Sequence, residues 1–379
     1  MRILHTSDWH LGRQFYNQSL LEDQHYALNQ IGSIVADRQV DVVIVAGDIY
    51  DRSVPPAAAV QLLDETINRI CNELQIPVIL IAGNHDGAER LAFGARQMSA
   101  AGLYVSGQLW ESPQEIVLQG RAGDEVAFYP IPFADLATLR NQYGTNFSTY
   151  NDAMGYLIDL IQTKRSSVRP AVSIAHCFLA GGEASESERP LAIGGVEYVL
   201  PELFQGFDYT ALGHLHGPQF RGAEKIRYSG SPLKYSFSEE RQNKSITLID
   251  LFQGQEIKIE KILLKPMRNM RTVEGPLEDI LRVGHADIHA DDYLQIRLSD
   301  THAILDVMNK LREIYPNVLH LERPGLMESN SLELNRERLK KGELSMFSDF
   351  YQQVTDAELN SEQKKIVSQE IEQLHREDC

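Results

Sequence analysis

Strand-like apolar runs alternate with helical patterns from the first residue to about residue 265. The runs are short and rich in aliphatic and β-branched residues, as expected for strands covered on both faces. Strands are predicted at residues 2–6, 41–46, 77–82, 171–175 and 209–212, and helices at residues 20–38, 56–74 and 154–165. Two more strand-like segments, residues 245–251 and 256–264, are expected to pair and close the domain. This alternation predicts a layered α/β sandwich.

Helical spacing supports the second of these helices. In the helix expected at residues 56–74, apolar residues recur at Val60, Leu63, Ile67 and Ile70. Positions three and four apart lie on one face of a helix, so this spacing is typical of a helix.

The pattern changes after Pro266. Strand-like runs at residues 269–273, 293–298 and 318–321 alternate with helical patterns at residues 277–281 and 303–314. This β-α-β-α-β order is typical of a small separate domain. Beyond residue 324 only amphipathic helical patterns follow, at residues 346–354 and 361–374, with Ser361 as the expected N-cap of the second. We therefore expect a main domain at residues 1–266, a small capping domain at 267–324, and a linker with partner-binding helices at 325–379.

Polar side chains with metal-binding chemistry follow the predicted strands of the main domain. Residues i and i+2 of an extended chain point to the same side, so pairs with this spacing can reach one ion. The candidates are Asp8 and His10 after the first strand, Asp48 after the second, Asn84 and His85 after the third, His176 after the fourth, and His214 and His216 after the fifth. Oxygen and nitrogen donors without thiolate favour manganese, iron or zinc.

Each of these motifs has an ordinary explanation when it is taken alone. Asn, Asp and Gly are frequent in turns, so GD and GNHD are also turn sequences. A single histidine such as His176 is more often a hydrogen-bonded core residue than a ligand. The complete set, with a suitable donor at the end of each strand, is far more specific than any member, and it favours a metal centre.

The motifs together resemble the calcineurin-like metallophosphoesterases. The resemblance is carried by D-x-H, GD-x-x-D, GNHD, a later strand-end histidine and GH-x-H. Four longer segments, HTSDWHLG, ESERP at residues 186–190, ALGHLH and YSGSP at residues 228–232, are similar to the SbcD family of nuclease subunits within that class. The resemblance covers residues 1 to about 265. One departure is Gly87 after GNHD, where the family pattern leads us to expect Ser, and which we expect to loosen the loop beside His85.

The resemblance implies a dinuclear centre with assigned ligands. Asp8, His10, Asp48 and His216 are expected to hold one metal ion, and Asp48, Asn84, His176 and His214 the other, so that Asp48 bridges them. Two such ions, most often Mn²⁺ in this family, lie about 3.5–4 Å apart and clamp both the attacking and the leaving oxygen. His85 is left without a metal and is expected to act on the leaving group as the catalytic residue. Asp51 or Asp86 is expected to orient His85 or a ligand, although both are equally well explained as turn residues.

The same resemblance implies a function in DNA repair, recombination and replication. SbcD-like proteins act as 3′–5′ double-strand exonucleases together with an SbcC-type ATPase, and as endonucleases on single strands and hairpins. A homodimer is also implied. The chain has no G-x-x-x-x-G-K-[ST] motif, so any ATP dependence has to come from the partner. We expect the C-terminal helices to bind that ATPase.

Composition constrains how such a protein holds its substrate. The formal net charge is −17, so a broad basic face for DNA is not expected, and metal ions, a local patch or the partner must supply the attraction. The three cysteines are scattered and the N-terminus has no apolar stretch of signal-peptide length. These features predict a soluble cytoplasmic protein without disulfides.

Two other functions fit parts of the sequence. A stand-alone phosphatase or cyclic-nucleotide phosphodiesterase has the same metal centre but no need of the region beyond residue 266. A non-catalytic scaffold has no need of an intact donor set. Both are therefore weaker explanations than a nuclease subunit.

Overall fold

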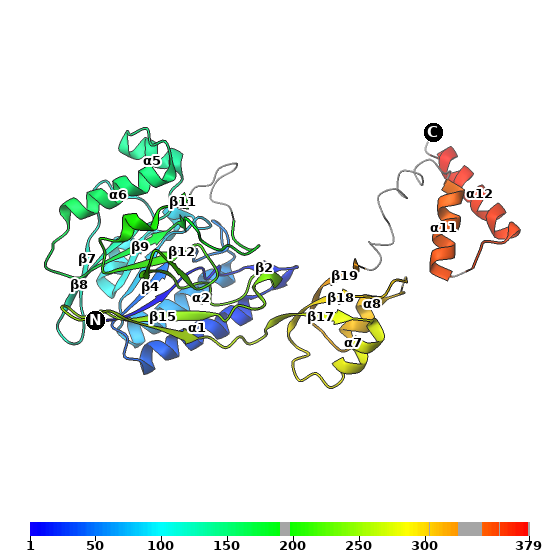
Figure 1. The fold of residues 1–379 in the computed structure, drawn as a ribbon, viewed down its shortest axis with the longest axis horizontal. Coiled ribbons are helices and arrows are strands. Elements are labelled where there is room, and N and C mark those ends of the chain that lie inside the picture. Colours follow the sequence, from blue (N-terminus) through cyan, green and yellow to red (C-terminus); the bar gives the residue numbers. More distant parts are fainter. Residues whose placement is uncertain (190–197, 303, 325–342, 356, 378–379) are drawn as a thin grey trace. The chain divides into compact units, whose positions relative to one another are not determined.

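The computed structural model of the chain describes residues 1–189, 198–302, 304–324, 343–355 and 357–377. Pro190 of the ESERP motif, Ala303 and residues 325–342, on which parts of the predictions fall, lie outside these ranges. The chain divides into two compact units, Met1–Asn269 and Met270–Cys379 (Figure 1). The division of the second unit into a capping domain and a partner-binding segment stays a prediction. Among the described residues, no helix is both long and apolar enough to cross a membrane.

The first unit is built on two six-stranded sheets. The first sheet has the order β16 (Lys258–Leu263), β15 (Ser245–Asp250), β1 (Arg2–Thr6), β4 (Val42–Ala46), β5 (Val78–Ile81) and β6 (Leu103–Ser106). Strands β1, β4, β5 and β6 are parallel, whereas β15 pairs antiparallel with both β1 and β16. The pairing predicted for the last two strands is therefore confirmed.

The second sheet was only partly predicted. Its order is β13 (Gln219–Arg221), β14 (Ala223–Tyr228), β12 (Tyr209–Gly213), β9 (Ala171–His176), β8 (Glu125–Ile131) and β7 (Ile116–Gln119). The central strands β14, β12, β9 and β8 are parallel, and the antiparallel strands β13 and β7 form the edges. In both sheets the parallel strands end on the same side, which is where the candidate ligands follow.

Side chains of alternate residues separate the layers. Ile3 packs between the two sheets, whereas its neighbour Leu4 packs under the helices of the first sheet. Those helices are α1 (Leu21–Asp37) and α2 (Ala57–Ile67), and α2 continues into a π-helical segment, Asn68–Glu73. The second sheet is covered by α6 (Tyr150–Lys164) (Figure 1). The predicted α/β sandwich is confirmed. Of the four apolar residues at helical spacing in α2 and its continuation, Val60 is 45% exposed and the other three are buried.

Short elements connect these layers. They are the strands β2 (Gln14–Phe15), β3 (Gln18–Ser19), β10 (Phe178–Leu179) and β11 (Tyr198–Val199), the helices α3 (Ala88–Leu91), α4 (Ala95–Met98) and α5 (Leu136–Tyr143), and the 3₁₀ turns Ser99–Ala101, Pro201–Phe204 and Phe237–Glu239.

The second unit contains a small parallel sheet and a helical pair. Strands β17 (Met270–Gly275), β18 (Tyr293–Leu298) and β19 (Val318–Glu322) alternate with α7 (Leu277–Gly284) and α8 (Val307–Arg312), and enclose their own apolar core. The last helices are α11 (Glu343–Thr355) and α12 (Ser361–Glu377), and Gln363 Nε2 of α12 donates to the Tyr351 hydroxyl of α11 over 3.3 Å. Ser361 is not the N-cap of α12. Asn360 is, because Asn360 and Gln363 each accept the other's backbone N–H over 2.9 Å.

Candidate metal centre

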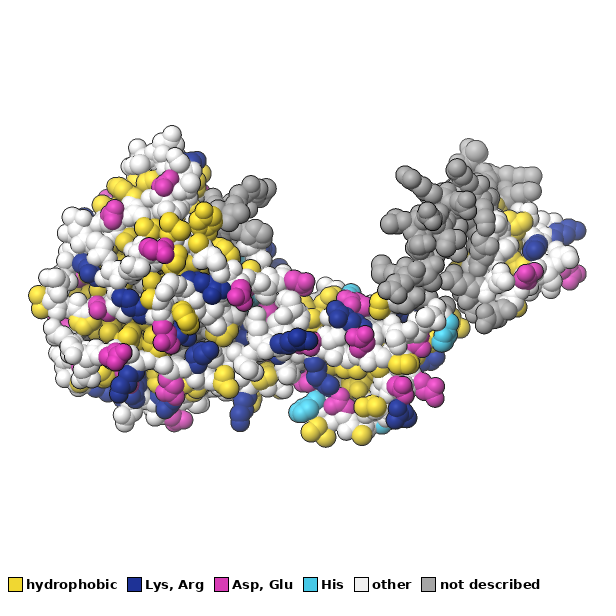
Figure 2. All heavy atoms as spheres, in the orientation of Figure 1, with side chains coloured by type: hydrophobic (Ala, Val, Ile, Leu, Met, Phe, Trp, Pro, Cys, Tyr) yellow, Lys and Arg dark blue, Asp and Glu magenta, His cyan; other side chains and the backbone are white. Residues whose placement is uncertain are grey.

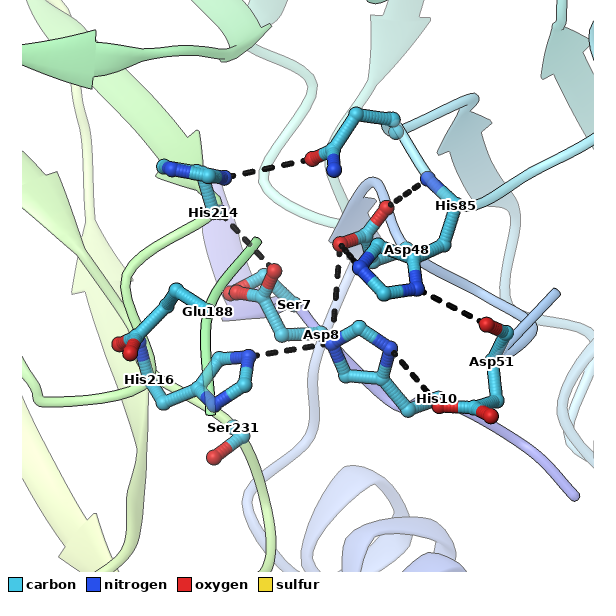
Figure 3. Close-up of polar contacts among 12 residues, drawn as sticks. Ser7, Asp8, His10, Asp48, Asp51, His85, Glu188, His214, His216 and Ser231 are labelled. Atoms are coloured by element: carbon cyan, nitrogen blue, oxygen red, sulfur yellow. Dashed lines mark hydrogen bonds and ion pairs between the residues drawn. The ribbon is translucent and has the colours of Figure 1, made fainter. Parts of the chain in front are cut away.

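All of the predicted site residues gather at one edge of the sandwich, where parallel strands of both sheets end. The first sheet contributes Asp8 and His10 beyond β1, Asp48 beyond β4, and Asn84 and His85 beyond β5. The second contributes His176, the last residue of β9, and His214 and His216 beyond β12 (Figure 3). Their side chains are buried, except that Asn84 is half-buried. The structure thus brings the set together, while the role of each residue as a ligand stays a prediction.

Left-handed backbone, rather than extended chain, aims the donors inward. The φ angles are 54° at Asp8, 46° at His10, 50° at Asp48 and 105° at His214. Residues other than glycine rarely adopt this region, and they do so mainly at functional sites where surrounding structure enforces it. The expected geometry, in which residues i and i+2 of an extended chain share a side, is therefore wrong for Asp8 and His10. Both residues still converge, because the chain turns at each of them.

Backbone hydrogen bonds hold these turns. Asp8 N donates to Gly47 O over 3.0 Å and His10 N donates to Asp48 O over 2.9 Å, so the loops after β1 and β4 run together. The sheets also approach closely here. A Cβ atom on Gly213 would lie 1.8 Å from the carbonyl oxygen of Ala46, so only glycine fits at the end of β12.

The donor atoms form two overlapping groups. In the first, His10 Nε2 lies 3.1 Å from His216 Nε2 and 3.6 Å from Asp48 Oδ2, and Asp8 lies in the same group. In the second, His176 Nε2 lies 3.5 Å from the same Asp48 oxygen. Asn84 Oδ1 lies 2.9 Å from His176 Nε2 and 3.3 Å from His214 Nδ1. Figure 3 shows Asp48 between the groups. Its carboxylate is therefore placed where a bridging ligand would be.

The electrostatics of the cluster fit divalent cations. Burial, and then the charge of Asp48, raises the pKa of Asp8 well above its usual value. Burial, and then neighbouring histidines, lowers the pKa of His10 and His214 well below theirs, so these imidazoles are neutral and can be ligands. Among the described residues, His10 Nδ1 has no hydrogen-bond partner and no lysine or arginine pairs with Asp8 or Asp48. Buried carboxylates facing neutral imidazoles form a set of donors suited to a divalent cation.

Carbonyl oxygens set the orientation of two histidines. His176 Nδ1 donates to Ala46 O over 2.9 Å, which leaves the Nε2 lone pair facing Asp48 and Asn84. His85 Nδ1 donates to Asp51 O over 2.8 Å, and the His85 backbone N–H donates to Asp48 Oδ1 over 2.9 Å. His85 Nε2 consequently faces the cluster, 3.9 Å from Asp48 Oδ2.

The two acidic residues expected to orient the site contact it through different groups. The Asp51 carboxylate lies 3.9 Å from His10 Nδ1. Asp51 holds His85 with its carbonyl oxygen, and its carboxylate pairs with Arg13 over 3.2 Å. Asp86 accepts hydrogen bonds from the backbone of Ile49, Tyr50 and Gly83 over 3.1, 2.9 and 2.9 Å. Burial, and then the charge of Asp48, raises the pKa of Asp86 to about 7. Asp86 thus fixes the loop that carries Asp48 rather than the His85 imidazole.

The effect of Gly87 on its loop stays a prediction, but the surroundings of this glycine are tight. A Cβ atom at this position would lie 2.8 Å from the carbonyl oxygen of Ser53, so the chain passes too closely for a serine without a shift. Gly87, the residue that departs from the family pattern, therefore lies where the GNHD loop closely contacts residues 51–54.

Several residues around His216 were not among the predicted site residues. The His216 backbone N–H donates to Glu188 Oε1 over 2.8 Å, and its Nδ1 lies 2.5 Å from Ser187 Oγ. Glu239 and Lys244 lie behind Ser187. Burial opposes ionisation of Glu239, but Lys244 and the hydrogen bonds around it outweigh burial and hold the pKa of this carboxyl below its usual range. The ESERP and YSGSP motifs were the sequence signals for this region.

Comparison with known proteins assigns the class. The calcineurin-like phosphoesterase family model matches residues 1–218, and the chain belongs to this family. The SbcD C-terminal model, described as the type 5 capsule protein repressor C-terminal domain, matches residues 266–355. Over 364 residues the chain is 37% identical to the SbcD subunit of nuclease SbcCD from Staphylococcus epidermidis (strain ATCC 12228 / FDA PCI 1200), covering 96% of both chains. Within its family the chain is thus an SbcD homologue.

Solved structures with a similar fold are much more distant. GAP50, the anchor in the inner membrane complex of Plasmodium, has a TM-score of 0.41 and 11% identity, covering 85% of this chain and 96% of its own. A dimetal phosphatase from Danio rerio has a TM-score of 0.42 and 8% identity, covering 69% and 95%. Likeness at this level carries no conclusion about function.

Proposed function

We propose that the chain is the nuclease subunit of an SbcCD-type complex and hydrolyses DNA phosphodiester bonds at a dinuclear metal centre. The observation that carries the proposal is the assembly of every donor of the phosphoesterase pattern into one buried cluster. Its principal activities would be 3′–5′ exonuclease on duplex ends with an ATPase partner, and endonuclease on single strands and hairpins. The 37% identity to the SbcD subunit of a nuclease SbcCD, over nearly the whole chain, supports this choice of substrate.

The metal ions proposed here are two Mn²⁺. Asp8, His10, Asp48 and His216 would hold one, and Asp48, Asn84, His176 and His214 the other. Oxygen and nitrogen donors without thiolate suit manganese, although zinc and iron share this preference. When bound, the ions supply Lewis acidity, which polarises a phosphate group and acidifies a water molecule.

His85 is proposed as the catalytic residue. The Nδ1–H group of His85 donates a hydrogen bond to the Asp51 carbonyl oxygen over 2.8 Å, so Nε2 is the nitrogen that faces the cluster. In its protonated form this imidazole can donate a hydrogen bond to a phosphate oxygen or a proton to the departing sugar oxygen. Asp51, through its carbonyl, would keep the ring in that orientation.

The alternative is a stand-alone phosphatase or cyclic-nucleotide phosphodiesterase with the same centre. It is disfavoured by the family match over residues 266–355, because an enzyme for small substrates needs no such region. Cleavage of an end-labelled hairpin DNA by the purified protein with Mn²⁺, with and without an SbcC-type ATPase, tests the choice, with Asp48→Ala as the inactive control. Hydrolysis of a small phosphate ester without any cleavage of DNA would favour the alternative.

The C-terminal helices are proposed as the docking element for the ATPase. Although α11 and α12 contact each other, Phe347, Phe350 and Ile366 remain 40%, 61% and 59% exposed. Apolar side chains on terminal amphipathic helices suit a groove or coiled-coil surface of another protein.

Two further partners complete the proposal. In the first unit, Val54 and Phe93 are 62% and 82% exposed, which supports self-association as a homodimer. Acidic and basic side chains are interspersed on the face of this unit in Figure 2, so an extended basic surface for DNA is not seen there. We therefore expect the ATPase to supply much of the DNA-binding surface.

The buried, unpaired thiols of Cys71 and Cys177 support a reducing compartment such as the cytoplasm.

A further inference from the structure

A buried row of polar side chains leads away from His216. Ser187 Oγ lies 2.5 Å from His216 Nδ1 and 2.6 Å from Glu239 Oε1, and Lys244 Nζ lies 2.5 Å from the other Glu239 oxygen. The exposed fractions of Ser187, Glu239 and Lys244 are 8%, 0% and 6%. Burying polar groups to this extent lowers the stability of the folded chain unless their hydrogen bonds are satisfied. The hydrogen-bonded row is therefore a specific feature of the fold.

The chemistry of the groups fixes the direction of each hydrogen bond. A lysine ammonium only donates and an ionised carboxylate only accepts, so Glu239 accepts from both Lys244 and Ser187. Ser187 has a single hydroxyl hydrogen, and Glu239 takes it. The Ser187 oxygen can then only accept from His216, which places a hydrogen on Nδ1 of the imidazole. The neighbouring Ser185 does not alter this, because its hydroxyl donates to Glu188 Oε2 over 2.5 Å.

The same residues hold the backbone of His216. Its N–H donates to Glu188 Oε1 over 2.8 Å, and its carbonyl oxygen accepts from Lys244 Nζ over 2.9 Å. Lys244 also donates to Ser231 Oγ over 3.0 Å, and Ser231 N donates to the same carbonyl over 3.1 Å. Ser187 and Glu188 of ESERP and Ser231 of YSGSP therefore surround one histidine. Glu188 and Ser231 are labelled beside His216 in Figure 3.

We propose that Ser187, Glu239 and Lys244 are positioning residues, which fix His216 as the Nδ1–H tautomer and aim its Nε2 lone pair at the metal centre. The inference deepens the proposed function and rests on it, since the benefit of this tautomer is metal binding. His176 obtains the same tautomer from one carbonyl oxygen, Ala46 O. Within the described part of the chain no carbonyl oxygen contacts His216 Nδ1, and Ser187 at the head of the buried row takes its place.

The first test reads the tautomer directly in metal-free protein. Nitrogen-15 NMR of histidine-labelled protein should show His216 with Nδ1 protonated and Nε2 unprotonated in the wild type. Ser187→Ala should give a mixture of tautomers, and Ser187→Thr, which keeps a hydroxyl, should restore the single one. Ser173→Ala is the matched control, because Ser173 is also buried and hydrogen-bonds Thr210 Oγ1 over 2.8 Å, in the middle of β9.

The second test measures Mn²⁺ binding by titration calorimetry. Ser187→Ala should weaken binding by about 10- to 100-fold, the usual effect of removing the partner of a metal-bound histidine. Glu239→Gln, combined with Lys244→Met so that no charge is left unpaired, should weaken it at least as much, because Lys244→Met also removes the hydrogen bond to the His216 carbonyl oxygen. Should Ser187→Ala not fold, the double variant decides by the same two measurements.

The possible failures are distinguishable. An unchanged tautomer and unchanged Mn²⁺ affinity in Ser187→Ala would overturn the positioning role while leaving the metal site intact. A Glu239→Gln/Lys244→Met variant that binds Mn²⁺ as tightly as the wild type would also overturn it. A wild-type protein that binds no Mn²⁺ would instead overturn the proposed function, and the tautomer measurement would still stand.

Discussion

The Nε2 atoms of His10 and His216 lie 3.1 Å apart, although the two residues are 206 positions apart in the chain. Each histidine follows a strand of a different sheet, so the contact joins the two halves of the sandwich. Two imidazole nitrogens at this distance share either a proton or a metal ion. The buried carboxylates of Asp8 and Asp48 beside them favour the metal ion.

Asp48 should serve both metal ions. Its Oδ2 atom lies 3.6 Å from His10 Nε2 and 3.5 Å from His176 Nε2, which belong to different groups of donors. Asp48→Ala should therefore abolish binding of both ions, whereas Asn84→Ala should affect one. Elemental analysis and anomalous scattering from a metal-loaded crystal measure this. A single ion in the wild type, or two that Asp48 does not contact, would contradict the assignment.

His85 should be separable from the ligands. His85→Ala should retain both metal ions while DNA cleavage falls by about 10²–10⁴-fold, the usual loss for a general acid or base. His214→Ala is the comparison, and it should lose metal and activity together. His85, His10 and Asp51 also lie close enough to hold an ion, so equal loss of metal from both variants would make His85 a ligand.

The exposed apolar residues of the C-terminal helices should carry ATPase binding. Phe350→Glu with Ile366→Glu, in the full chain, should weaken the complex tenfold or more by surface plasmon resonance, because exposed apolar anchors dominate such interfaces. Nicking of single-stranded DNA with Mn²⁺ should be unchanged. Ile288→Glu is the matched control, since Ile288 is 89% exposed elsewhere in the second unit. Loss of the complex with Ile288→Glu alone would transfer the docking site to the small sheet domain.

His5 should make stability fall in acid. Burial lowers the pKa of His5 from 6.5 to about 3 in the folded chain. As pH falls below about 6.5, His5 becomes protonated in the unfolded chain but stays neutral in the folded chain. The free energy of unfolding therefore falls by up to about 1.4 kcal/mol per pH unit. Urea unfolding of metal-free protein between pH 7 and pH 4 should therefore have a shallower pH dependence in His5→Asn. The exposed His25→Asn serves as control, and equal slopes in wild type and His5→Asn would refute the prediction.

Gly87→Ser should destabilise the protein rather than tighten its loop. The new Cβ would lie 2.8 Å from the Ser53 carbonyl oxygen, and overpacking of this kind costs about 1–3 kcal/mol. Thermal unfolding measures the effect, and Gly155→Ser is a suitable control because its Cβ would meet only Leu203 at 3.8 Å. A higher melting temperature for Gly87→Ser would show that the loop has room to adjust.

Sequence pattern predicted most clearly the strands whose residues are apolar throughout. Strands β4 and β5, VVIVA and VILI, are buried on both faces and read as continuous runs. Strand β8 was missed because Pro130 interrupts it, and β14 because it contains Glu224, Lys225 and Arg227. Arg227 is nevertheless buried, paired with Glu224 over 3.0 Å, and no local pattern reveals such a pair.

The predicted donors lie together in the folded chain, but their geometry was not predicted. Donor types at strand ends are visible in sequence, whereas the contacts around Nδ1 of His216 are not. The left-handed φ angles of Asp8 and His10 were not visible either, because they depend on hydrogen bonds that these two residues donate to the loop after β4. Ser187 and Glu239 are 52 positions apart, so their contact with each other behind His216 follows only from the folded chain.

The position of β1 has a consequence for synthesis of the protein. This first strand lies inside its sheet, between β4 and β15, and β15 is made only after residue 244. In a chain emerging from the ribosome, Asp8 and His10 are therefore made long before β15, which completes their sheet. They are also made long before β12, which is followed by His214 and His216. The proposed nuclease would therefore be inactive during translation, and it would become active only when the whole first unit has emerged.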